Sequence, residues 1–432
     1  MEYNSESIME AFLDFNNKLI ITRNFVASTY EECLENITKL SPNKEIEDEI
    51  NKKISEFIKN KLDSISSFEE FNEYIDKIIT ESCEKRGIDH TKFATQLAKK
   101  FAENCKLALN FNMANYGDFI NFYTTSQSIV LKNGLENIII YFIEFLSQCF
   151  KLFFASHPGS MKNFQFAYSD ISSCLSLDEI KNNLSSLITE QIMHKSKEEI
   201  FKEFFKHHSI ESQYYEKHKA EILEIFYRRN IFVHNNGVVN KNYLGCSGNI
   251  FGFKEGQDAP IDIEYLYNSC SYLLLLSADI VTSIVSRLEK HNKKFDEKAN
   301  KLSGIAFNCY LCQKDWKFAR EFYSILITSK LISDDMRDMY QLNIWLCDKF
   351  SGKFKPSKKL ISEWTKKRAF TCIGFSALIE DYDTMEKLII ENKYSPNDAI
   401  EIDSICTWPI FIEYREKQTL RFKNFCKKLK TC

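Results

Sequence analysis

Arginine, asparagine and histidine gather at the end of one apolar pattern and form the strongest chemical signal in the chain. The stretch 221–240 reads EILEIFYRRNIFVHNNGVVN and holds Arg228, Arg229, Asn230 and His234. An imidazole titrates near neutral pH and can give or take a proton, while the planar guanidinium of arginine suits the oxygens of a phosphate. Buried helices rarely hold four such groups together without partners. The stretch is therefore a candidate site for proton transfer and phosphate binding.

The same stretch has the pattern of an amphipathic helix. Its apolar residues recur at helical spacing, at Ile222, Ile225, Phe226 and Val233. The Asn-Asn-Gly run at 235–237 is typical of a helix C-terminus, because glycine readily takes the left-handed conformation there. We therefore expect the helix to end where the polar groups gather.

Arg229, the polar Asn230 beside it and His234 after four intervening residues resemble the Arg-(four to six)-His signature of HEPN-domain ribonucleases. The surrounding RRNIFVHNNGVVN is similar to HEPN modules of bacterial toxins and phage-defence proteins, and the likeness covers roughly residues 120–290. It implies a metal-independent endoribonuclease without a cofactor. It also implies a homodimer, in which the site forms where two copies of the signature helix meet.

By this resemblance, His234 acts as acid or base, Arg229 binds the phosphate, and Asn230 orients an oxygen or fixes the histidine tautomer. Arg228 and Asn235 are further candidates for contact with the substrate. RNA would be cut by attack of a ribose 2′-OH, leaving a 2′,3′-cyclic phosphate and a 5′-OH.

Helical geometry limits how these residues can meet. Asn230 and His234 lie one above the other on a helix, whereas Arg229 and His234 are about 140° apart around the axis. They converge only if the last turn frays or a second copy of the helix approaches. A purely structural interpretation is also open, in which Arg228, Arg229 and His234 cap the last carbonyls, where cations are favoured by about 0.3–1 kcal/mol.

The composition is typical of a soluble, mostly helical protein. Its 432 residues include only 12 Gly and 6 Pro, with 44% hydrophobic and 27% charged residues. A net charge of −3 excludes a global basic field, so any binding of RNA must depend on local patches.

The cysteines and the apolar segments favour a cytoplasmic protein that does not span a membrane. The 14 Cys are scattered, and the first residues, MEYNSESIMEAFL, carry acidic groups where a secretory signal has positive charge. Cys309 and Cys312 form one CxxC without a second pair, which favours a helix face over a metal site. The apolar segments 135–155 and 265–288 contain charged residues that are costly in a bilayer, so we expect core helices of a bundle.

The chain divides into three all-α units. We expect an N-terminal helical segment over 1–115, a HEPN-like helical bundle over 116–292, and an α-solenoid-like domain over 293–432. The last unit has helix pairs with large and small apolar residues alternating, which resemble tetratricopeptide repeats.

Local signals predict several element ends. Ser5 or Ser7 should cap the first helix, Ser176 a helix in the middle, and Asp262 the long apolar helix. The stretch 45–63 has a helical stripe, and His207-His208 is expected at a solvated helix end.

Three further stretches leave alternatives open. The glycine-rich residues 244–260 are either a long loop or a short strand pair. The basic stretches 351–370 and 415–430 are either solvated faces or a groove for RNA phosphates or an acidic partner. In the HEPN interpretation, a protein or ligand trigger would act through the C-terminal domain.

Two other functions compete with the ribonuclease. One is a non-catalytic HEPN module that binds nucleotide or RNA. The other is a helical scaffold for protein interactions, in which the signature helix is only a dimer seam. Replacement of His234 separates the first of these from an enzyme, because a binder keeps its affinity.

Overall fold

The protein is all-α, as predicted. The computed structural model describes residues 3–39, 81, 116–289, 295–329, 332–396 and 398–431. Within these ranges it has 16 α-helices and no strand, and one isolated antiparallel bridge joins Val238 to Asp258. The predicted stripe at 45–63 lies outside the described residues.

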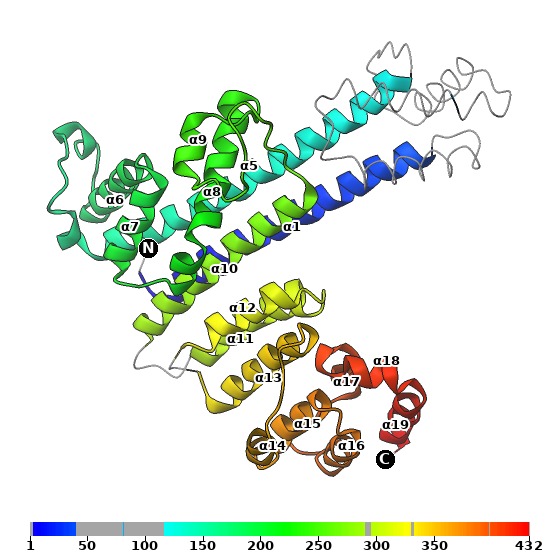
Figure 1. The fold of residues 1–432 in the computed structure, drawn as a ribbon. Coiled ribbons are helices and arrows are strands. Elements are labelled where there is room, and N and C mark those ends of the chain that lie inside the picture. The colour runs from blue at the N-terminus through cyan, green and yellow to red at the C-terminus, as the bar shows by residue number, and fades with distance from the viewer. Residues whose placement is uncertain are drawn as a thin grey trace.

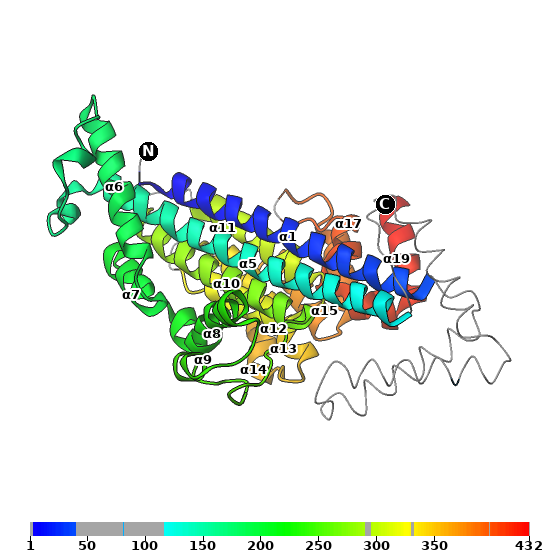
Figure 2. The ribbon, with the colours of Figure 1, turned by 90° about the horizontal axis from the view of Figure 1, so that it is seen from above.

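Three long helices form the body of the molecule. Helices α1 (Ser5–Lys39), α5 (Tyr116–Ser156) and α10 (Ile263–Leu288) lie side by side (Figures 1 and 2). Helix α1 is the main described part of the N-terminal helical segment predicted over 1–115. It packs its apolar face along α5 and α10.

Aromatic packing explains why α1 belongs to the bundle. Phe12, Phe15 and Leu19 recur at helical spacing and are almost fully buried. The ring of Phe15 lies 5.7 Å from that of Phe145 and 5.9 Å from that of Phe142, both on α5. Burying each such side chain stabilises the fold by about 1.5–3 kcal/mol.

Shorter helices surround one end and one side of this body. Helices α6 (Leu177–Met193) and α7 (Lys197–His208) cover the end near the N-terminus, and α8 (Gln213–Asn235) packs on α10 and α5. Helix α9 (Lys241–Cys246) follows α8.

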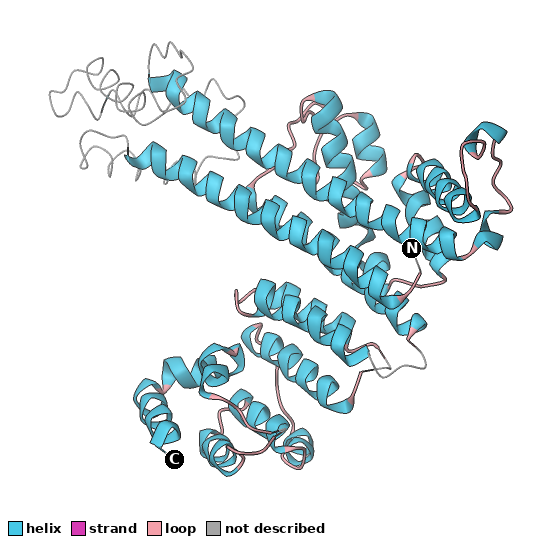
Figure 3. Ribbon diagram, turned by 180° about the vertical axis from the view of Figure 1, so that it is seen from behind, coloured by secondary structure: helices cyan, strands magenta, loops and turns pink. Residues whose placement is uncertain are grey.

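The C-terminal part is an array of short helices on the other side of the body (Figure 3). Its members are α11 (Phe295–Ala306), α12 (Trp316–Leu326), α13 (Asp334–Phe350), α14 (Lys358–Trp364), α15 (Ala369–Leu378), α16 (Tyr382–Glu391), α17 (Ile402–Thr407), α18 (Ile412–Lys417) and α19 (Thr419–Thr431). The predicted pairs are present, since α12 packs on α13 and α15 on α16. Helix α12 also packs on α10 and so joins the array to the body.

Two described helices, Ser128–Ser156 within α5 and Ile263–Leu288, are long and apolar enough to cross a membrane by length and composition. In α10, however, 83% of the apolar window is buried inside the structure. A helix that is apolar all round is expected in the core of a large helical protein, which accounts for α10 without a bilayer.

The predicted caps are confirmed for two helices and wrong for the first. Ser176 Oγ accepts from the Glu179 backbone N–H at 3.2 Å, and Asp262 Oδ1 accepts from that of Tyr265 at 2.6 Å. Helix α1 is capped by Asn4, whose Oδ1 accepts from the Ser7 backbone N–H at 2.9 Å. Ser5 instead donates its hydroxyl to Glu289, a long-range contact with no local signal.

The expected solvation of His207-His208 is wrong for His208. Its side chain packs among the rings of Phe150, Phe153 and Phe204, and the residue is 1% exposed. Its Nδ1 lies 2.7 Å from the Tyr3 hydroxyl. Burial lowers the pKa of His208 to about 3.

This burial predicts a loss of stability in acid. An exposed histidine in the unfolded chain has a pKa of about 6.5, so the unfolded state binds the extra proton below that pH while the folded state does not. The free energy of unfolding should therefore fall as the pH drops from about 6.5 toward 3. When the free energy of unfolding is measured with urea at several pH values in this range, it should change less with pH in His208→Phe than in the wild type. His194→Phe, which replaces a side chain that is 79% exposed, should show the same pH dependence as the wild type. An equal pH dependence of the free energy of unfolding in all three proteins would contradict the prediction.

Candidate functional site

The signature stretch forms helix α8, and the helix ends where the Asn-Asn-Gly run predicts. Asn236 and Gly237 have positive φ angles of 53° and 85°. The Gly237 backbone N–H donates to the Ile231 carbonyl at 3.0 Å, which satisfies a carbonyl of the last turns. The glycine-rich residues 244–260 hold the end of α9, turns and Asp258, which forms an isolated bridge to Val238, so this described stretch is mainly a loop and the alternative of a strand pair is wrong.

Replacing Gly237 by alanine should destabilise the protein strongly. A Cβ there would lie 2.5 Å from Cε1 of Phe232, and the left-handed backbone adds strain. These effects together should cost roughly 2–4 kcal/mol. The matched control is Gly248→Ala, which has φ +64° but nothing within 4 Å of the new Cβ, so it should lose only the smaller backbone part. Urea unfolding of both variants measures the difference, and an equal loss would refute the clash.

Arg229, Asn230 and His234 are accessible on α8. Arg229 and Asn230 are half-buried and His234 is exposed. In the described part of the chain, none of the three side chains forms a hydrogen bond or an ion pair. The charge of Arg229 still reaches α7, where burial and then Arg229 lower the pKa of Lys197. Among the described residues, the side chains of these three thus make no polar contact that holds the fold.

The three do not converge within one chain. The one non-helical residue of α8 is His218, so the helix is regular from Arg229 to His234 and continues to Asn235. Asn230 and His234 share a face, while Arg229 points about 140° away from His234. The last turn is not frayed at His234. Convergence through a frayed last turn therefore does not occur in this helix.

Arg228 does not fit the predicted contact with substrate, because it is buried and two of its three side-chain nitrogens are hydrogen-bonded within the fold. It is 1% exposed, and its Nε donates to Glu224 Oε1 at 2.6 Å. A second nitrogen donates to the Pro260 carbonyl at 2.8 Å, and the guanidinium lies 4.5 Å from the centre of the Tyr265 ring. Position 228 faces the interior, one residue before the accessible Arg229.

Asn235 is also used by the fold, which does not support the predicted contact with substrate. Its Nδ2 donates to the Val238 carbonyl at 2.6 Å and so closes the turn after α8.

Sequence reasoning missed Glu224, which is the centre of a buried polar cluster. Glu224 is 1% exposed and accepts from Arg228, from the Tyr243 hydroxyl at 2.5 Å and from the Tyr265 hydroxyl at 2.7 Å. The spacing of Glu224 and Arg228 is that of an i, i+4 ion pair, a signal present in the sequence. The two tyrosines come from α9 and α10, and no local pattern announces them.

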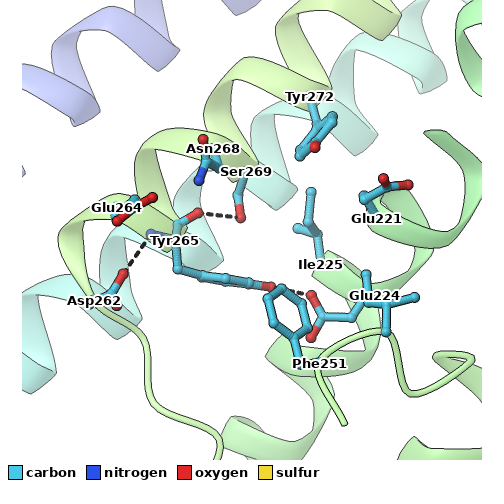
Figure 4. Close-up of a pocket in the computed structure, with 11 residues that line it drawn as sticks. Glu221, Glu224, Ile225, Phe251, Asp262, Glu264, Tyr265, Asn268, Ser269 and Tyr272 are labelled. Carbon is cyan, nitrogen blue, oxygen red and sulfur yellow. Dashed lines mark hydrogen bonds between the residues drawn. The ribbon is translucent and has the colours of Figure 1, made fainter. Parts of the chain in front are cut away.

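A cavity of about 410 Å³ opens beside this cluster (Figure 4). Its wall includes the carboxylates of Glu221, Asp262 and Glu264. Ile225, which also lines it, is nine residues before His234 and so lies on the opposite side of α8. The cavity does not include the predicted site residues, and its carboxylates would repel the phosphates of a nucleotide.

No group of three or more potential metal ligands occurs among the described residues. Cys309 is 7% exposed and lies in a π-helical turn, Phe307–Leu311, with Cys312 just after it. Burial raises the pKa of both thiols.

The arginines of the two basic stretches are largely engaged within the chain. Arg368 pairs with Asp335 and Asp398, and Arg421 with Asp383 and Glu386. These pairs reduce the positive charge that either stretch can offer to a phosphate backbone.

Comparison with protein-family models, with curated proteins and with solved structures found no match to this chain.

Proposed function

We propose that the protein is a metal-independent endoribonuclease of HEPN type that acts as a homodimer. The observation that carries the proposal is the separation of roles on α8. Arg228 and Asn235 are bound into the fold, whereas Arg229, Asn230 and His234 have no such engagement and lie near the accessible end of the helix. Helix-capping cations would contact carbonyls, and no such contact by Arg229 or His234 is present among the described residues.

The chemistry follows from the groups that remain. Cleavage without a metal needs a base for the 2′-OH, an acid for the leaving 5′ oxygen and a cation for the phosphorane charge. Two histidines, one from each protomer, supply the proton donor and acceptor. Arg229 stabilises the phosphate charge through its planar fork, and Asn230 holds the imidazole or a ribose oxygen in place.

A dimer seam at the end of α8 fits its surface. Val233 is 44% exposed directly beside His234, an apolar side chain that a second helix would cover. A two-fold axis there brings Arg229 of one protomer toward His234 of the other, which one chain alone cannot do.

The experiment treats total cellular RNA with the purified protein in EDTA and maps the fragment ends. Discrete fragments with 2′,3′-cyclic phosphate and 5′-OH ends support the proposal. Fragments with 5′-phosphate ends, or activity abolished by EDTA, would reject a metal-free 2′-OH mechanism. RNA binding without cleavage by wild type would favour the non-catalytic HEPN module. By analogy with HEPN modules, the proposed setting is the cytoplasm of a bacterium, in phage defence or as a toxin.

A further inference from the structure

A second cavity, of about 240 Å³, lies where the C-terminal array meets the body. Its wall combines α8, α10 and α12 and includes Tyr214, Lys217, Asp279, Arg320 and Glu321. It is distinct from the proposed cleavage site, because Tyr214 and Lys217 lie in the first turns of α8 and His234 in its last.

Two buried polar atoms at this cavity have no hydrogen-bond partner in the described structure. Tyr214 is 5% exposed, and its hydroxyl is unpartnered. Oε2 of Glu321 is likewise buried and unpartnered. Buried polar groups in folded proteins nearly always have a partner, so these two atoms indicate that something else supplies one.

The cations around the cavity are already used. Lys217 Nζ lies 2.5 Å from Oε1 of Glu321, and Arg320 Nε donates to Asp348 at 2.6 Å. His218 Nε2 also lies 3.2 Å from Oε1 of Glu321. The acceptor Oε2 of Glu321 therefore still lacks a donor, while the positive groups have carboxylate partners.

Glu321 is ionised at neutral pH. Burial alone would raise its pKa, but the hydrogen bonds from His218 and Lys217 outweigh burial and bring the pKa to about 2. Burial, followed by nearby acidic groups, raises the pKa of Tyr214 well above its usual value, so its hydroxyl stays neutral. A neutral hydroxyl and a buried carboxylate oxygen that lacks a donor among the described residues together suit a ligand that donates N–H groups.

We propose that this cavity binds a small organic cation, a primary amine or a guanidinium, whose N–H groups donate to Oε2 of Glu321 and to the Tyr214 hydroxyl. The volume is below the range of about 300–1,000 Å³ that holds drug-sized ligands, which limits the ligand to a few carbons beyond its charged group.

The site joins the C-terminal array to the signature helix. Glu321 belongs to α12, while Tyr214 and His218 belong to α8, and α8 departs from helical geometry at His218, with φ −117° and ψ 23°. A bound cation would thus contact both units at the bend of α8. Its binding does not depend on the ribonuclease proposal.

The test is isothermal calorimetry of the full chain with n-butylammonium, methylguanidinium and, as the anionic probe, inorganic phosphate. Tyr214→Phe is the informative variant, because the hydroxyl it removes has no partner in the described chain and the fold should not suffer. Tyr382→Phe is the matched control, since it removes another buried, unpartnered hydroxyl in α16, far along the array. Glu321→Gln removes the charge.

Support requires saturable binding of at least one cation and none of phosphate. Loss of one hydrogen bond in Tyr214→Phe should then weaken that binding roughly 2- to 10-fold, with Tyr382→Phe unchanged. Glu321→Gln should weaken it more. Failure of both cations to bind, saturable binding of phosphate, or equal affinity in wild type and Tyr214→Phe would each overturn the proposal. Calorimetry does not involve RNA, so these outcomes are independent of cleavage.

Discussion

Replacing His234 by alanine is expected to remove RNA cleavage while leaving the fold intact. The side chain is exposed and makes no hydrogen bond to a described residue, so the free energy of unfolding should change by less than about 0.5 kcal/mol. Loss of a general acid or base lowers turnover by about 100- to 10,000-fold. Initial rates of cleavage in EDTA, together with urea unfolding of the same samples, measure both effects.

His194→Ala is the control for this experiment, since it removes another highly exposed histidine away from α8. It should cleave as wild type does. Arg229→Lys should also lose most activity, because an ammonium cannot make the two parallel hydrogen bonds of a guanidinium to a phosphate. If His234→Ala keeps wild-type turnover, His234 is not the proton-transfer group and the assignment of this site is wrong.

Removing Glu224 is expected to cause the largest loss of stability among the substitutions considered. Glu224→Ala leaves the buried guanidinium of Arg228 without its counter-ion and two tyrosine hydroxyls without their acceptor. Breaking a buried ion pair in this way costs about 3–5 kcal/mol. The variant should unfold at a much lower urea concentration than wild type.

Two further variants test whether the loss of stability in Glu224→Ala comes from the buried ion pair. Adding Arg228→Met to Glu224→Ala should recover part of the loss, because the unpaired charge is then gone. Lys359→Ala breaks an exposed pair of the same i, i+4 spacing, with Glu363, and should cost no more than about 0.5 kcal/mol. If Glu224→Ala costs as little as Lys359→Ala, the cluster does not hold α8, α9 and α10 together.

The sequence predicted the features that depend on local signals. The end of α8, the caps at Ser176 and Asp262, and the pairs α12/α13 and α15/α16 follow from residue spacing or from single side chains. Such signals act between residues that are close in the sequence, so a single amino-acid sequence is enough to detect them.

Features that depend on distant contacts were not predictable. His208 is polar and sits at a helix end, yet Tyr3, Phe150 and Phe153, all distant in the chain, help to bury it. The difference between Arg228 and Arg229 also comes from tertiary packing, since only one of the two adjacent positions faces α9 and α10. The i, i+4 spacing of Glu224 and Arg228 was the one local signal that Arg228 is paired inside the fold.

The position of α1 has a consequence for the synthesis of the protein. Its buried face, which includes Phe12 and Phe15, is covered by α5 and α10, whose residues follow much later in the chain. Translation adds about 5–20 residues per second, so several seconds pass between the emergence of α1 and that of α5. Until α5 emerges, the apolar face of α1 lacks both of these partners and is open to a ribosome-associated chaperone.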